Sequence, residues 1–445
     1  MDGTWQEVPN EDPGGNGALG RDILARSSPL ADAADLDPLL ERIGEARYVL
    51  LGEASHGTHE YYLWRARLSR RLIEEKGFSF IAVEGDWPDC FRANCYVRGE
   101  SDDASAAEAL AGFTRWPTWM WANWEVAALV DWLRGHNERQ PDRQNVGFFG
   151  LDVYSLRESL EAIAGFLGEN HPEAVEDARR AFRCFEALGG DDPQEYALAT
   201  RLVPASCERE VLDLLREVRD RVRTDAARGD LAALDAETNA EVVRGAEAYY
   251  RTMILGGPGS WNLRDRHMAA TLDRLMAFHG PEAKAIVWAH NTHIGDARHT
   301  DMAGEGMLNL GQIVREEHAA EGVVLVGFGS YEGSAIAGRA WDAPMEAMPV
   351  PPARAGSWEA ALHLLGGEDR LLLFPPEAAP SALAAPRGHR AIGVVYRPEA
   401  EWGNYVPTAL PLRYDAFLYL DRTRALHPMR VQTDAGPPEL YPWNA

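Results

Sequence analysis

The chain has 445 residues, of which 46% are hydrophobic, and it carries a formal net charge of −25 with a pI near 4.9. This composition is globular and excludes a disordered chain, and the length allows about two or three structural units. Because so acidic a surface repels phosphate backbones and anionic lipid headgroups, we expect neither nucleic acid nor a membrane as a partner.

The N-terminus and the cysteines bear on the cellular location. Residues 1–20 are rich in Gly, Pro and Asp, which predicts a loose N-terminal arm without the features of a signal peptide. No apolar run reaches the roughly 18 residues that span a bilayer. These features predict a cytoplasmic protein. The four cysteines are too few for a disulfide framework, and we interpret them as small buried apolar residues: Cys90, Cys95, Cys184 and Cys207.

Short apolar runs alternate with amphipathic helical segments along much of the chain. The runs are continuously apolar, which is typical of strands buried on both faces of a parallel sheet. The alternation predicts an α/β fold with a mostly parallel sheet and flanking helices, for example over residues 60–75 and 125–137. The expected strands are Tyr48–Leu51, Phe80–Val83, Val146–Phe149, Ala285–Trp288, Val323–Val326, Ala391–Tyr396 and Ala416–Leu420.

One long segment breaks this alternation. From Ser155 to about His279 the sequence contains only amphipathic helical segments, such as "PEAVEDARRAFRCFEAL" and "SWNLRDRHMAATLDRLMAF". We therefore predict an inserted all-helical subdomain over residues 155–283. It would separate the two halves of the α/β core, residues 21–154 and 284–445.

Polar residues follow several of the expected strands directly. In an open α/β sheet, ligands bind beyond the carboxyl ends of the strands, so residues just after different strands converge on one site. The candidates in chain order are Glu53 and His56, then Glu84, then Asp152, then His290 and His293, and then Tyr331.

These residue types suit the activation of a water molecule. An imidazole can take a proton from water near neutral pH, and we predict that His56 is this general base. A carboxylate from Glu53 or Glu84 would orient the ring and stabilise its charged form. Negative charge that develops on a carbonyl oxygen needs donors, and we expect them to be Arg65, His290 and His293.

Other residues are expected to bind substrate. In "NLRDRHM", Arg264 and His267 stand three positions apart on one helix and would reach the cleft from the helical unit. The stretch "RWPTWMWANW" would either line an apolar pocket, through Trp119, or pack in the core. Asp152 and Tyr331 complete the predicted substrate-binding set.

Metal, serine and nucleotide chemistry leave different signatures. We predict no required cofactor, but a divalent metal such as zinc remains an alternative. "GEASHG" is not a G-x-S-x-G elbow, and neither H-E-x-x-H nor a phosphate-binding glycine motif occurs. If a metal binds, its expected ligands are Glu53, His56, Glu84 and His290.

The motifs resemble the erythromycin esterase family. They include "GEASHGTHEYY", "RRLIEEKGFSFIAVEGDWPD", "FTRWPTWMW", "GFFGLDVYSL", "SWNLRDRHM", "WAHNTHIGDAR", "LNLGQIVRE" and "AIGVVYRPE", in order over roughly residues 45–430. The resemblance implies a deep cleft between an α/β core and a helical insertion. It also implies hydrolysis of a macrolide lactone by activated water, without a serine nucleophile. By motif, it assigns the family's functional residues to His56, Glu53, Glu84, Arg65, His290 and His293.

We therefore predict a hydrolase that cleaves a small-molecule ester or macrolide lactone, with antibiotic inactivation as one role. Two alternatives remain open. The chain could be a natural-product biosynthetic enzyme that uses the same cleft for cyclisation or other acid–base chemistry, or a non-catalytic protein that binds a metal or ligand. The sequence does not indicate an oligomeric state.

Overall fold

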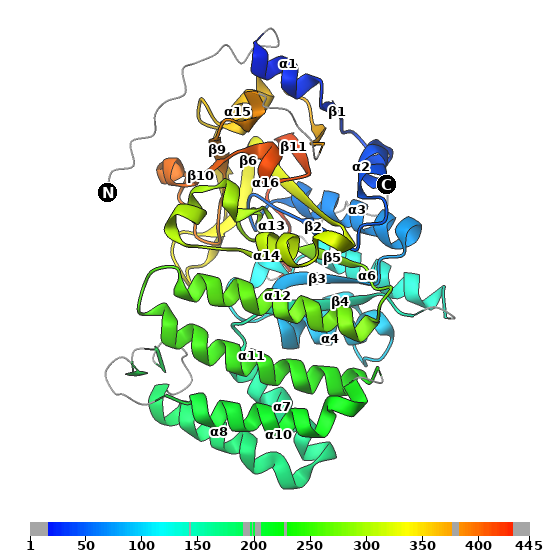
Figure 1. Cartoon of the computed structure of the whole chain (residues 1–445), viewed down its shortest axis with the longest axis vertical. Helices are drawn as coiled ribbons and strands as arrows, with labels where there is room; N and C mark the ends of the chain where they lie inside the picture. The colour runs from blue at the N-terminus through cyan, green and yellow to red at the C-terminus, as the bar shows by residue number, and fades with distance from the viewer. Residues whose placement is uncertain are drawn as a thin grey trace.

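The computed structural model describes residues 17–141, 144–189, 196–197, 199–200, 206–226, 229–375 and 382–429. Its centre is a nine-stranded mixed sheet in the order β1-β8-β11-β6-β2-β5-β3-β4, with β7 paired to β6 (Figure 1). A separate two-stranded sheet joins β9 and β10. The strands are β1 (Ser27–Pro29), β2 (Tyr48–Leu51), β3 (Phe80–Asp86), β4 (Gly147–Asp152), β5 (Ala285–Trp288), β6 (Val323–Gly338), β7 (Met345–Val350), β8 (Arg370–Leu373), β9 (Arg387–Arg390), β10 (Tyr405–Thr408) and β11 (Ala416–Arg422).

Helices cover both faces of the sheet and continue beyond one end of it. They are α1 (Ala18–Leu24), α2 (Asp37–Ile43), α3 (His59–Lys76), α4 (Trp87–Arg98), α5 (Ala106–Ala109), α6 (Trp124–Glu138), α7 (Leu156–Asn170), α8 (Val175–Gly189), α10 (Glu208–Ala226), α11 (Leu231–Met253), α12 (Gly259–His279), α13 (Asn291–Ile294), α14 (Leu310–Glu317), α15 (Trp358–His363) and α16 (Leu410–Arg413). None of the described helices is long and apolar enough to cross a membrane.

The predicted fold class is confirmed, and β2 shows why the central strands read as continuously apolar. Side chains alternate between the two faces of a strand. Val49 and Leu51 pack into the apolar cluster that contains α3 and α6 residues, whereas Tyr48 and Leu50 pack into the cluster on the α12 and α14 side. Both faces are therefore buried, and β11, β6, β2, β5, β3 and β4 run parallel.

One predicted strand is wrong. Residues 391–396 are not a strand but an irregular segment with isolated bridges from Ile392 to Ser55 and from Val395 to Gly338. The segment is apolar because it covers the turn after β2, where the Ile392 amide donates to the Ala54 carbonyl at 2.7 Å. The short strands β1, β7, β8, β9 and β10 were not predicted.

The helices α7, α8, α10, α11 and α12 form a stack at the lower end of Figure 1, with α12 next to the sheet. Helices are the only regular secondary structure among the described residues between Leu156 and His279. This region has an apolar cluster of its own, which runs from Val153 to Tyr250. The domain boundaries remain a prediction. Of the arm predicted for residues 1–20, only residues 17–20 are described, and Ala18–Gly20 belong to α1.

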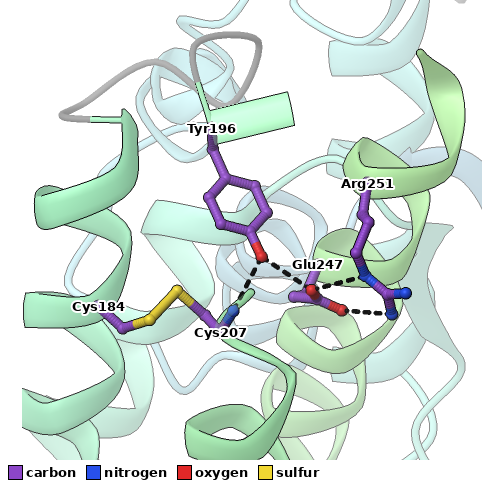
Figure 2. Close-up of a disulfide and its surroundings, with 5 residues drawn as sticks. All are labelled: Cys184, Tyr196, Cys207, Glu247 and Arg251. Atoms are coloured by element: carbon purple, nitrogen blue, oxygen red, sulfur yellow. Dashed lines mark hydrogen bonds and ion pairs between the residues drawn. A yellow bond between two sulfur atoms is a disulfide. The ribbon is translucent and has the colours of Figure 1, made fainter. Parts of the chain in front are cut away.

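The interpretation of the cysteines needs a correction. Cys184 of α8 and Cys207 form a disulfide (Figure 2), so they are not free apolar residues; Cys90 and Cys95 are free. Beside the disulfide, the Tyr196 hydroxyl accepts from the Cys207 amide at 3.0 Å and donates to Glu247 of α11 at 2.8 Å. The disulfide and the tyrosine therefore link three parts of the helical stack. Since disulfides persist mainly in oxidising compartments, the cytoplasmic location stays a prediction.

Candidate active site

The carboxyl ends of β2, β3 and β4 open onto a cavity of about 140 Å³. His56, Glu84 and Asp152 line it from three different strand ends, and Arg264 of α12 lines it from the helical stack. The register between β3 and β4 shifts after Val83, so Glu84 lies in an irregular part of its strand. Such irregularities re-aim side chains near functional sites. Aromatic residues complete the wall: Phe113, Trp116, Trp121, Tyr154 and Trp341.

The turn after β2 is held in place by neighbouring backbone. A Cβ atom on Gly57 would lie 1.9 Å from the Ile336 carbonyl oxygen of β6, so only glycine allows this approach. The Gly57 carbonyl accepts from the amides of Ile336, at 2.9 Å, and Leu426, at 3.0 Å. The turn that carries His56 is therefore fixed by packing and by backbone hydrogen bonds.

Glu53 connects two of the predicted catalytic residues. His56 Nδ1 lies 2.8 Å from Glu53 Oε1, and Arg65 Nη2 donates to Glu53 Oε2 at 2.7 Å. Arg65 is fully buried, with its guanidinium 4.3 Å from the Tyr62 ring and 4.6 Å from the Trp288 ring. A carboxylate at Nδ1 fixes the Nδ1–H tautomer, which leaves a lone pair on Nε2 of His56. Arg65 does not line the cavity but lies behind Glu53.

Arg264 joins the strand-end carboxylates into one cluster. It donates through Nε and Nη2 to the two oxygens of Asp152, at 2.9 and 2.7 Å, and through Nη2 to Glu84 at 2.7 Å. Burial would raise the pKa of Glu84, but the charges of His293 and Arg264 hold it well below its ordinary value. Burial is outweighed in the same way at Asp152, where Arg264 lowers the carboxyl pKa. Both carboxylates are therefore charged at neutral pH.

His290 is a neutral ring beside His56. The two ring centroids are 4.9 Å apart, and the His290 amide donates to Glu84 at 2.8 Å. Burial and the nearby His56 hold the pKa of His290 well below its ordinary value. Its Nδ1 accepts from the Thr292 amide at 3.3 Å, so the proton lies on Nε2. Nε2 is buried and has no hydrogen-bond partner among the described residues.

His293 belongs to the carboxylate cluster as a charged ring. Its Nδ1 lies 2.9 and 3.0 Å from the two oxygens of Asp265. Its Nε2 lies 3.3 Å from Glu84 Oε1 and 3.0 Å from Arg264 Nη1. Burial would lower the pKa of His293, but the two carboxylates outweigh burial and the nearby Arg264 and raise the pKa to about 9. The charged ring therefore stabilises the folded state at neutral pH.

Because the folded state keeps His293 charged, we expect the unfolding free energy to depend on pH. The contribution of His293 should be complete below its ordinary pKa of 6.5 and be lost as the pH rises through about 9. Over that range, the unfolding free energy of the wild type should lose roughly 3 kcal/mol relative to His293→Gln, at about 1.36 kcal/mol per pKa unit. Urea unfolding at several pH values measures this. The partly exposed His171→Gln variant serves as a parallel histidine control. A difference between the wild type and H293Q that does not change with pH would contradict the assignment.

Three predicted substrate-binding residues lie elsewhere. His267 lines a different cavity, between α10, α11 and α12, Tyr331 stacks on His363 with 3.6 Å between ring centroids, and Trp119 is buried in the core cluster with α3 and α6 residues. Most other lining residues were not among the predicted site residues, and they include Arg115 and Tyr154. Arg115 donates to Asp86 at 2.9 Å. The sequence indicated such a pair, because a carboxylate at the end of a buried apolar strand needs a partner for its charge.

The residues expected to hold a metal do not form a metal site in this conformation. Among the described residues, the groups of three or more ligand atoms within 4.8 Å of one another do not include Glu53, His56, Glu84 and His290 together. We therefore derive no catalytic step through a metal ion.

Comparisons with known proteins find relatives both by sequence and by fold. A family model described as erythromycin esterase matches residues 73–423. Erythromycin esterase type II of Escherichia coli is 25% identical over 320 residues, which cover 68% of this chain and 73% of that protein. A solved succinoglycan biosynthesis protein has a TM-score of 0.74 at 21% identity, covering 92% of this chain and 97% of that one. A mutant of the erythromycin esterase EreC in its open conformation has a TM-score of 0.63 at 18% identity, covering 89% and 97%. These two structures show a shared fold.

Proposed function

The chain belongs to the erythromycin esterase family, and we propose that it is an esterase-type hydrolase in which His56 activates a water molecule. The observation that carries the proposal is the chain of contacts from Arg65 through Glu53 to His56. The last residue in this series of contacts is His56, whose ring lines the cavity. Its Nε2 lone pair is available to accept a proton. The series has the base and orienting carboxylate of a hydrolytic triad, and water takes the place of a serine nucleophile.

The reaction proceeds in two steps. His56 Nε2 takes a proton from water while the water oxygen bonds to the ester or lactone carbonyl carbon, which gives a tetrahedral oxyanion. The carbon–oxygen bond to the alcohol then breaks, and the imidazolium returns its proton to the leaving oxygen. Glu53 stabilises the imidazolium between the two steps, and Arg65 keeps Glu53 charged and in place.

His290 is the proposed donor to the developing oxyanion. Its buried Nε2–H has no partner among the described residues, and leaving such a donor unsatisfied costs about 1–3 kcal/mol. An oxygen that becomes negative in the transition state would satisfy it and be stabilised in return. The Glu84 carboxylate accepts a hydrogen bond from the His290 amide and so fixes the backbone at His290. Arg264 donates to Glu84 and fixes this carboxylate in turn.

The cavity limits how a large substrate would bind. Pockets that bury a drug-sized ligand hold roughly 300–1,000 Å³, whereas this cavity holds about 140 Å³. It therefore accommodates the reacting ester group and a small flanking part. We propose an ester or macrolide lactone as the substrate, with most of a macrolide outside the described cavity, and inactivation of an antibiotic as the role.

Mass spectrometry in ¹⁸O-labelled water tests the proposal. Purified protein is incubated with erythromycin and with a panel of simple esters and lactones. We expect one product to gain a single water, with the label in the new carboxylate. An unlabelled product with a rearranged ring would instead support the biosynthetic alternative. A ligand that stays bound without any turnover would support a non-catalytic binding protein.

A further inference from the structure

A second cluster of metal-ligating side chains lies outside the cavity. It joins His59, the first residue of α3, Glu125 near the start of α6, and His427, which follows β11. His59 Nδ1 and His427 Nδ1 lie 2.6 and 2.7 Å from the same Glu125 oxygen, Oε1. The three ligand atoms are within 4.8 Å of one another. None of the three residues lines the cavity that contains His56, so the cluster is separate from the proposed chemistry.

The cluster is closed on one side and open on the other. His59 and Glu125 are 6% and 2% exposed, while the His427 side chain is 39% exposed. The two imidazole rings meet edge-on, with centroids 5.3 Å apart. Both rings thus direct a nitrogen toward one carboxylate, and solvent reaches the cluster from the side of His427.

Backbone hydrogen bonds fix these three positions independently of the side chains. The His59 amide donates to the Arg424 carbonyl at 2.8 Å, and the Trp124 amide donates to the His427 carbonyl at 3.0 Å. The Met429 amide donates to Ala122 at 3.0 Å. Residues 424–429 therefore cross the starts of α3 and α6 in a fixed register, which holds all three ligands in place before any ion binds.

We propose that His59, Glu125 and His427 bind one divalent transition-metal ion of the zinc class. Two imidazoles and one carboxylate with an open fourth position are an established donor set for such ions. On binding, each neutral ring moves its proton from Nδ1 to Nε2, so that Nδ1 coordinates the ion. The ligand atoms must also separate by several tenths of an ångström, because ligands about 2.0–2.1 Å from a tetrahedral zinc lie roughly 3.3 Å apart.

The ion would fasten the C-terminal segment to the turn that carries the proposed base. His59 stands three residues after His56, and His427 belongs to the segment that also contacts Gly57 through Leu426. The site therefore acts on the stability of this turn without touching the substrate. It does not depend on the proposed function, since its test uses metal binding alone.

Metal titration of the full-length protein tests the site. After removal of metal with a chelator and dialysis, Zn²⁺ is titrated by calorimetry, and Co²⁺ is followed through its visible absorption. We expect one equivalent of each ion, and an affinity for Zn²⁺ that falls by about 100-fold or more in His427→Gln. Two controls should bind like the wild type: His171→Gln, and His318→Gln from the other potential cluster, Asp273, Glu317 and His318.

A second variant separates loss of a ligand from loss of structure. His427→Cys removes the imidazole and its hydrogen bond to Glu125 but supplies a thiolate, which is a good zinc ligand. We expect H427C to bind one Zn²⁺ more tightly than H427Q and to add a thiolate-to-metal absorption band with Co²⁺. The proposal is overturned if the wild type binds no stoichiometric Zn²⁺, if H427Q binds like the wild type, or if H427C binds no better than H427Q.

Discussion

Replacing His56 with Asn should lower kcat by roughly 10²–10⁴-fold, the contribution of a general base, while KM changes little. Asn cannot accept the proton of water at neutral pH, and it loses the Nδ1 contact to Glu53 at 2.8 Å. The rate should be measured with whichever ester or lactone gives the labelled product. The unfolding free energy of the variant, measured in parallel, establishes that the enzyme assayed is folded.

A matched histidine provides the control. His363 Nδ1 lies 2.7 Å from a carboxylate oxygen of Asp421, but His363 does not line the cavity. His363→Asn therefore loses the same kind of contact and should keep the wild-type kcat. If H56N retains activity within a few-fold of the wild type, or if H363N loses as much as H56N, His56 is not the general base.

The convergence of the site was predictable because the central strands are parallel. A parallel sheet brings the carboxyl ends of its strands to one edge, and continuous apolar runs marked the ends of β2, β3, β4 and β5 in the sequence. His56, Glu84 and Asp152 consequently line one cavity, and His290 and His293 contact Glu84. Their spacing in the chain, from residue 56 to residue 293, does not matter once the strand ends are known.

Side-chain direction was harder to predict. Arg65 stands on the helix next to the cavity, but it points into the core because Tyr62 and Trp288 offer two ring faces and Glu53 offers a carboxylate. His267 lies one helical turn from Arg264, yet it lines a different cavity. These outcomes depend on which neighbours the fold brings to each side of a helix, and helical periodicity alone does not identify those neighbours.

Short edge elements and long-range bonds left little pattern in the sequence. The strand β8 has only the residues Arg370–Leu373 and pairs antiparallel with β1 and β11. The disulfide between Cys184 and Cys207 joins residues 23 positions apart across a helical region. Partner choice in both cases is decided by tertiary packing, which a single sequence does not display.

The cluster around Arg264 explains why buried carboxylates are tolerated at the strand ends. Glu84 and Asp152 are 4% exposed, and an isolated buried carboxylate would be costly. Arg264 contacts both, its pKa is raised well above the ordinary value by these charges despite burial, and its guanidinium also packs 4.9 Å from the Tyr154 ring. One side chain from α12 therefore compensates two charges from the sheet.

Replacing Arg264 with Met should destabilise the protein by about 3–5 kcal/mol at neutral pH, because it leaves buried carboxylates without their partner. Asp152 would keep its contact with the Val153 amide at 2.8 Å but lose both bonds to the guanidinium. The pKa of Asp152 should rise, so protonation relieves the buried charge. The unfolding free energy, measured in urea, should therefore differ least from the wild type at acid pH and most above neutrality.

A double variant and an exposed pair distinguish lost charge compensation from lost packing. Asp152→Asn in the R264M background removes the uncompensated charge and should restore part of the lost stability, whereas a defect caused only by the missing volume of Arg264 would persist. Arg92 also donates twice to one carboxylate, Asp103, at 3.2 and 2.6 Å, but its side chain is 46% exposed. Arg92→Met should consequently cost no more than about 1 kcal/mol. Equal losses for R264M and R92M would show that burial of the Arg264 cluster does not determine its contribution.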